Sequence, residues 1–69
     1  MRYEILIMRA LEAQTLLFNN FHYARENADR LRFFLFDCEI HLFEIDDSPI
    51  FDNDNEFIGS KNDSKEISF

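Results

Sequence analysis

Chain-breaking residues are almost absent from this sequence, and their positions limit where an ordered unit can lie. The single proline is Pro49 and the single glycine is Gly59, so only the Asn19-Asn20 pair interrupts residues 1–47. We therefore expect one small globular domain over residues 1–47 and an acidic C-terminal tail over residues 48–69. The tail sets apolar pairs among polar residues, which fits a frayed terminus and a docked strip equally well.

A helix is predicted to follow Asn20. Ala24, Ala28, Leu31 and Leu35 recur at the spacing of one helical face. Asn20 is a suitable N-cap, because its side-chain oxygen can accept from the first free backbone N–H groups. Two arginines near the far end suit the negative pole of the helix dipole.

Strands are predicted on both sides of this helix. Apolar Cys38, Ile40 and Leu42 alternate with residues 39, 41 and 43, which is typical of a strand with one apolar face over residues 38–45. Before the helix, alternation and β-branched residues favour a strand over residues 3–10. A bend at residues 12–14 and a second strand over residues 15–19 would follow.

These elements predict an α+β fold, a small ββαβ layer with one helix on an antiparallel sheet. The alternative is an all-α helical hairpin. It arises because Leu31, Leu35, Cys38, Leu42 and Ile45 also satisfy helical spacing.

The chain has 14 acidic residues against 7 Lys and Arg, a formal net charge of −7. Direct binding to nucleic acid is not expected, because that needs clustered cations facing the phosphates. The longest apolar runs, residues 5–8 and 33–36, are far shorter than the roughly 20 residues of a membrane-spanning helix. With no secretory signal visible and one Cys, we expect a cytoplasmic protein without membrane contact or an internal disulfide.

Motifs for catalysis or for a cofactor are not found, so we expect no enzyme activity, no cofactor and no metal site. Cys38 and His41 form a C-x-x-H pair, but an odd separation on a strand places them on opposite faces. Asp52, Asp54 and Glu56, with Asp63 further on, imitate a calcium loop. The match fails because the required Gly and final Glu are missing.

Charge is divided unevenly along the chain. Residues 1–32 have a net charge of +1 and residues 33–69 a net charge of −8, with eight acids and no Lys or Arg between Asp37 and Glu56. In an extended segment, carboxylates two residues apart, such as Asp52, Asp54 and Glu56, would form a row on one side. Such a row would be attracted to a cationic groove. The candidate partner-binding residues are Asp37, Glu39, Glu44, Asp46, Asp47, Asp52, Asp54 and Glu56, with Phe51 and Phe57 as apolar anchors.

Aromatic residues make up 16% of the chain, including nine Phe. A domain of this size cannot enclose them all, because the Phe33–Phe36 run points to opposing sides in either secondary structure. Exposed apolar area usually marks a contact surface. We therefore expect a protein partner or a homodimer.

In size, acidity and lack of motifs, the chain is similar to the small anti-restriction and anti-CRISPR proteins of phages and to phage inhibitors of host polymerase. That resemblance implies a non-enzymatic inhibitor that occupies the basic nucleic-acid-binding surface of a host protein. The alternative is a small structural or assembly subunit that binds its protein partner through exposed Phe residues.

Overall fold

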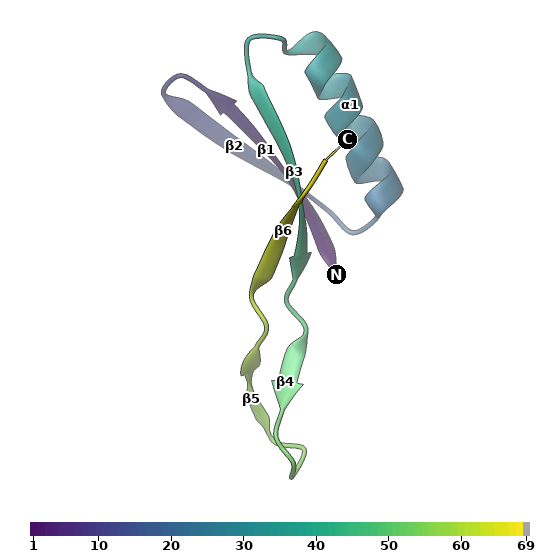
Figure 1. Cartoon of the computed structure of the whole chain (residues 1–69), viewed down its shortest axis with the longest axis vertical. Coiled ribbons are helices and arrows are strands. Elements are labelled where there is room, and N and C mark those ends of the chain that lie inside the picture. Colours follow the sequence, from purple (N-terminus) through teal and green to yellow (C-terminus); the bar gives the residue numbers. More distant parts are fainter. Residues whose placement is uncertain (69) are drawn as a thin grey trace.

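A computed structural model of the chain describes residues 1–68; Phe69, the last residue of the expected tail, lies outside the described residues. Figure 1 shows one helix beside a sheet and a narrow hairpin that extends away from both. The elements are β1 (Arg2–Arg9), β2 (Glu12–Phe18), α1 (Phe21–Phe34), β3 (Glu39–Asp46), β4 (Pro49–Phe51), β5 (Phe57–Ser60) and β6 (Asp63–Ile67).

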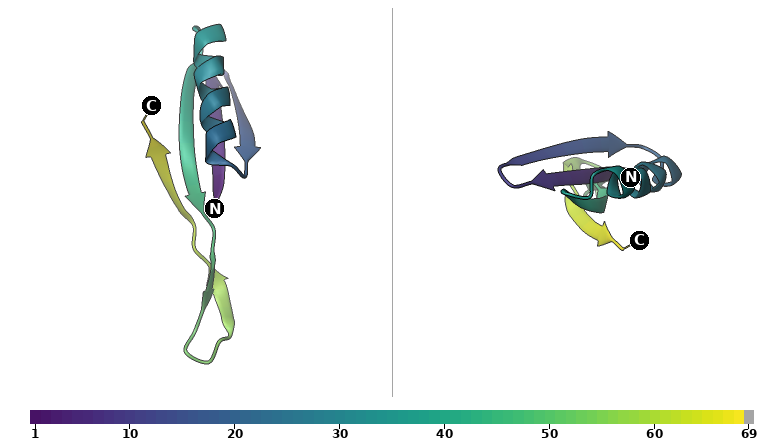
Figure 2. Two further views of the ribbon diagram at one scale, coloured as in Figure 1. Left: turned by 90° about the vertical axis from the view of Figure 1, so that its right-hand side faces the viewer. Right: turned by 90° about the horizontal axis from the view of Figure 1, so that it is seen from above.

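The main sheet has four antiparallel strands in the order β2-β1-β3-β6, and α1 packs on one of its faces (Figure 2). The predicted α+β class, with one helix on an antiparallel sheet, is therefore confirmed. The all-α alternative is wrong, because residues 39–46 pair as a strand with both β1 and β6.

The core is small and lies between α1 and the two central strands. A row of paired residues, Leu16, Ile5, Leu42 and Ile67, crosses all four strands on the helix side of the sheet. Ile5 and Leu42, in the centre of this row, are fully buried. Ala24 and Ala28 of α1 are also buried, because their small side chains let the helix approach the sheet closely; Ile40 completes the buried set.

The helix begins where the sequence predicts. Asn20 is extended, and its Oδ1 accepts hydrogen bonds from the backbone N–H groups of His22 at 2.8 Å and Tyr23 at 3.2 Å. These bonds satisfy donors that have no partner within the helix. The helix ends at Phe34, after which the Leu35 N–H donates to the Leu31 carbonyl at 2.7 Å.

The first hairpin differs from the prediction in its turn. The turn lies at Ala10 and Leu11, and residues 12–14 pair with β1 instead of forming a bend. Glu12, Ala13 and Gln14 are good helix formers, but pairing along the full length of β1 outweighs that weak local preference.

Beyond residue 48 the chain forms three strands that the sequence pattern does not predict. β4 and β5 form a separate two-stranded sheet, which we call the arm (residues 49–60). β6 then returns to the main sheet and pairs with β3. The arm explains the elongated shape, which measures 51 × 27 × 16 Å.

Candidate functional site

Several of the candidate acids have cationic partners elsewhere in the fold. Asp37 lies 3.5 Å from Arg9, and Asp47 lies 3.0 Å from Arg2. Both arginines belong to β1, which pairs with β3 and so brings the two charge-opposed parts of the chain together. These acids are therefore partly neutralised by the N-terminal half of the chain.

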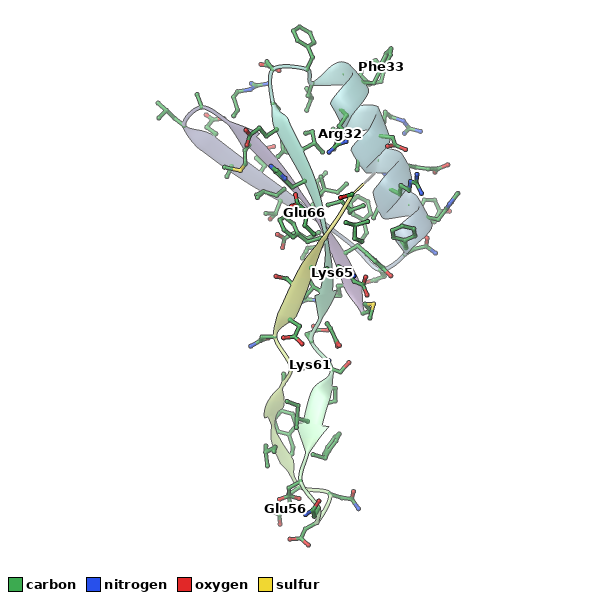
Figure 3. The ribbon with its side chains drawn as sticks, in the orientation of Figure 1. Arg32, Phe33, Glu56, Lys61, Lys65 and Glu66 are labelled. Atoms are coloured by element: carbon green, nitrogen blue, oxygen red, sulfur yellow. The ribbon has the colours of Figure 1, made fainter. Side chains whose placement is uncertain are left out.

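Asp46 belongs to a polar network at the base of the arm, where β3 leads into β4. Its Oδ1 accepts hydrogen bonds from the Ser48 hydroxyl at 2.7 Å and the Ser48 N–H at 3.2 Å. Its Oδ2 lies 3.1 Å from Nζ of Lys61, which also lies 3.6 Å from Asp63 (Figure 3). The bonds from Ser48, and then the Lys61 ammonium, lower the pKa of Asp46 from 3.8 to about 2. The Lys61 N–H also donates to the Ser48 carbonyl at 2.8 Å, so both strands of the arm are tied together where they leave the sheet.

The arm itself holds four exposed apolar side chains. The exposed fractions are 42% for Ile50, 55% for Phe51, 64% for Phe57 and 63% for Ile58. The Phe51 and Phe57 rings contact each other edge to face, with centroids 6.2 Å apart. Within residues 1–68, β4 and β5 contact no helix or strand except one another.

A tight acidic loop closes the arm. Oδ1 of Asp52 accepts from the N–H groups of Asp54 at 2.9 Å and Glu56 at 2.8 Å, and the Asp52 N–H donates to the Glu56 carbonyl. Asn55 takes a left-handed conformation with φ of 61°, which Asn tolerates better than most residues. The predicted extended row of Asp52, Asp54 and Glu56 is therefore wrong, because these residues form a turn whose first carboxylate is used internally.

Asp54 and Glu56 remain at the tip of the arm, where Figure 3 labels Glu56. No described Lys or Arg forms an ion pair with either carboxylate. Asp63, the last member of the calcium-like pattern, lies at the base of the arm beside Lys61 instead. Among the described residues, no three His, Cys, Asp or Glu side chains are grouped to hold a metal ion.

His41 and Cys38 lie on different sides of the sheet. Cys38 packs against the core, whereas His41 lies on the face away from α1, between the carboxylates of Glu66 and Glu39. The His41 Nδ1 to Glu66 distance is 2.5 Å, and Nε2 lies 3.6 Å from Glu39. The bond to Glu66 raises the pKa of His41 above its usual 6.5. The C-x-x-H pair therefore does not converge on one site.

A second group of exposed apolar residues lies at the opposite end of the molecule from the arm. Phe33 and Phe34, at the C-terminal end of α1, and Phe36, in the turn that follows it, are 79%, 66% and 91% exposed. Figure 3 labels Phe33 at this end. The expectation that the Phe33–Phe36 run cannot be enclosed is confirmed.

The sequence pattern did not predict that Ile50 and Ile58 lie on one hairpin with Lys61 at its base. A signal for the arm was present, because two apolar pairs flank the Asp-Asn-Asp-Asn run, a composition typical of a hairpin loop. The network around Lys61 had no local signal, because its members are brought together only when β6 pairs with β3.

No protein-family profile, no curated protein and no solved structure matches this chain. No helix within the described part of the chain combines the length and the apolar character needed to cross a membrane.

Proposed function

We propose that this chain is a non-enzymatic binding protein that inserts its arm into a cleft of a protein partner. The observation that supports this most is the placement of Ile50, Phe51, Phe57 and Ile58 on a hairpin that packs on no other element among the described residues. A two-stranded hairpin without a covering layer is marginally stable in water. A partner that covers these side chains would stabilise the arm and gain the free energy of apolar burial.

The form of the arm suits insertion. The network of Asp46, Ser48 and Lys61 holds the base and the Asp52 side chain holds the loop, so less ordering is left to occur on binding than in a hairpin without these contacts. A preorganised segment loses less conformational entropy when it binds. Aromatic residues such as Phe51 and Phe57 are typical anchors at the centre of an interface.

The charge of the tip specifies the partner further. Asp54 and Glu56 would enter or border the cleft beside the apolar anchors, so we expect Lys or Arg at its rim. A partner of this kind combines an apolar pocket with a cationic edge, and a nucleic-acid-binding protein is one class that offers the latter.

A comparison of paired variants tests the proposal. The full chain, immobilised, is exposed to lysate of the cells that encode it, next to a Phe51→Ser/Phe57→Ser variant and a Phe33→Ser/Phe36→Ser variant. The second variant is the matched control, because it removes two equally large exposed rings from the other end of the molecule. We expect a captured protein that is lost with the arm variant and kept with the control. Loss with the control alone, or with neither variant, contradicts the proposal.

A second candidate function is the inhibitor that imitates nucleic acid and binds mainly through its acids. The observation that favours it is the pair of tip carboxylates without a described cationic partner. Asp54→Lys/Glu56→Lys tests it while leaving Asp52, which closes the loop, in place. An electrostatic mimic would lose its partner with this variant and at high salt, whereas apolar insertion would survive high salt.

A further inference from the structure

One edge of the main sheet is unprotected. β2 is the outer strand beside β1, and six of its seven residues are exposed (Figure 1). In an edge strand, alternate peptide groups point outward without a partner in the sheet. Leu16 and Leu17 of this strand are 40% and 58% exposed.

The opposite edge, β6, differs in the features that prevent strand pairing. β6 has five residues, three of which are charged: Asp63, Lys65 and Glu66. β2 has seven residues and one charge, at Glu12, and contains no Pro, no Lys and no bulge. Charged side chains, short length and bulges are the devices that protect natural sheet edges, and of these β2 has only the single charge of Glu12, at its first residue.

The sequence of β2 is complementary to itself in the antiparallel direction. When Thr15 faces the Thr15 of a second copy, Leu17 faces Ala13 and Leu16 faces Gln14, so each large apolar side chain meets a smaller or polar one. Each Glu12 faces Phe18, and the two Glu12 carboxylates stand at opposite ends of the paired region, about 20 Å apart. That separation exceeds the screening length at physiological salt, so the strand pair contains no direct charge repulsion.

We propose that β2 pairs antiparallel with β2 of a second copy of this chain, joining two four-stranded sheets into one continuous sheet. The surface involved is separate from the arm, so the inference does not depend on the proposed function. The face of the sheet away from α1 would also become continuous. Leu6 pairs with Thr15 within one copy, so Leu6 and Thr15 of the two copies would form one row across the centre.

Pairing in this direction fixes the positions of the two arms. β1 is antiparallel to both β2 and β3, so β2 and β3 run in the same direction, and the arm continues from the end of β3. Reversing β2 in the second copy therefore points its arm the opposite way. The dimer would present one arm at each end.

Sedimentation velocity over a wide concentration range, at low and high salt, tests the dimer. The expected result is a monomer–dimer equilibrium that shifts toward dimer as salt rises, because salt screens the repulsion between two chains that each carry a net charge of −7. Thr15→Lys places two like charges face to face and should raise the dissociation constant by up to about fivefold. Ser64→Lys, at an exposed position on the other edge strand, adds the same charge away from β2; it is the matched control and should not raise the dissociation constant.

A cross-linking measurement identifies the edge even where Thr15→Lys does not fold. In a Cys38→Ala background, Thr15→Cys should form a covalent dimer on mild oxidation, and Ser64→Cys should not. A monomer at every concentration and salt condition overturns the proposal. So does a dimer that is insensitive to Thr15→Lys, or one that cross-links through Ser64→Cys and not through Thr15→Cys.

Discussion

Single polar residues decide where the segments of this small chain begin and end. Asn20 satisfies two backbone donors at the start of α1, and Asp52 satisfies two in the loop of the arm. Both act over two to four residues of sequence. The Asn20 cap could therefore be predicted from the sequence, since it depends on no distant contact.

Replacing Asn20 with Ala should lower the free energy of unfolding by about 1 kcal/mol, because two N–H groups at the helix start lose their acceptor. Urea unfolding followed by circular dichroism measures the change. Asn20→Asp is the control and should retain the stability, since a carboxylate oxygen caps equally well. Equal destabilisation by Ala and Asp would show that the Asn20 amide acts in some other way.

At the scale of elements, polar contacts join β6 and the arm to the rest of the sheet. β6 contributes only Ile67 to the core, so its attachment also depends on the pair formed by His41 and Glu66. These contacts could not be predicted from the sequence, because residues 41 and 66 are distant along the chain. The alternation of Cys38, Ile40 and Leu42, in contrast, favoured the strand from the sequence alone, and pairing of β3 with β1 and β6 excludes the helical hairpin that the same residues also allowed.

The raised pKa of His41 predicts a pH-dependent attachment of β6. A group whose pKa is higher in the folded state than in the unfolded state stabilises the fold when it is protonated. For His41 this stabilisation is fully present below pH 6.5, the pKa of the unfolded state, and is lost as the pH rises through the higher pKa of the folded state. Amide hydrogen exchange in β6, corrected for the intrinsic effect of pH, should therefore accelerate above neutral pH. His41→Gln and Glu66→Gln should each remove this change; a wild-type response that persists in both variants would contradict the assignment.

The pKa of Asp46 indicates whether the polar network at the base of the arm is formed. This pKa is lowered to about 2 by the bonds from Ser48 and by Lys61. The free energy that the ionised Asp46 carboxylate contributes to folding is therefore fully present above pH 3.8 and is lost as the pH falls toward 2. Ser48→Ala and Lys61→Met should each raise the pKa of the Asp46 carboxyl toward 3.8 in an NMR titration. Lys65→Met, which removes the same charge from a position opposite Glu44, should leave the pKa unchanged. An unchanged pKa in the first two variants would mean that the network is not formed in solution.

For the whole molecule, the main feature is that more large apolar side chains are exposed than buried. Among residues 1–68, the large buried side chains are Ile5, Ile40 and Leu42, whereas large exposed apolar side chains are found on the arm, at the end of α1 and on β2. The Phe-rich composition predicted exposed apolar area but could not place it. The charge pattern was less informative, because pairing of β1 with β3 brings Arg2 and Arg9 to acids that look unopposed in the sequence.

If the arm is the surface that meets a partner, site-specific photocross-linking in the cells that encode the chain should detect that contact. A photoreactive phenylalanine analogue is placed at Phe57 in one variant and at Phe36, which is more exposed, in another. We expect a covalent adduct with one discrete protein from position 57 and none from position 36. An adduct from position 36 alone, or no adduct from position 57, would contradict it.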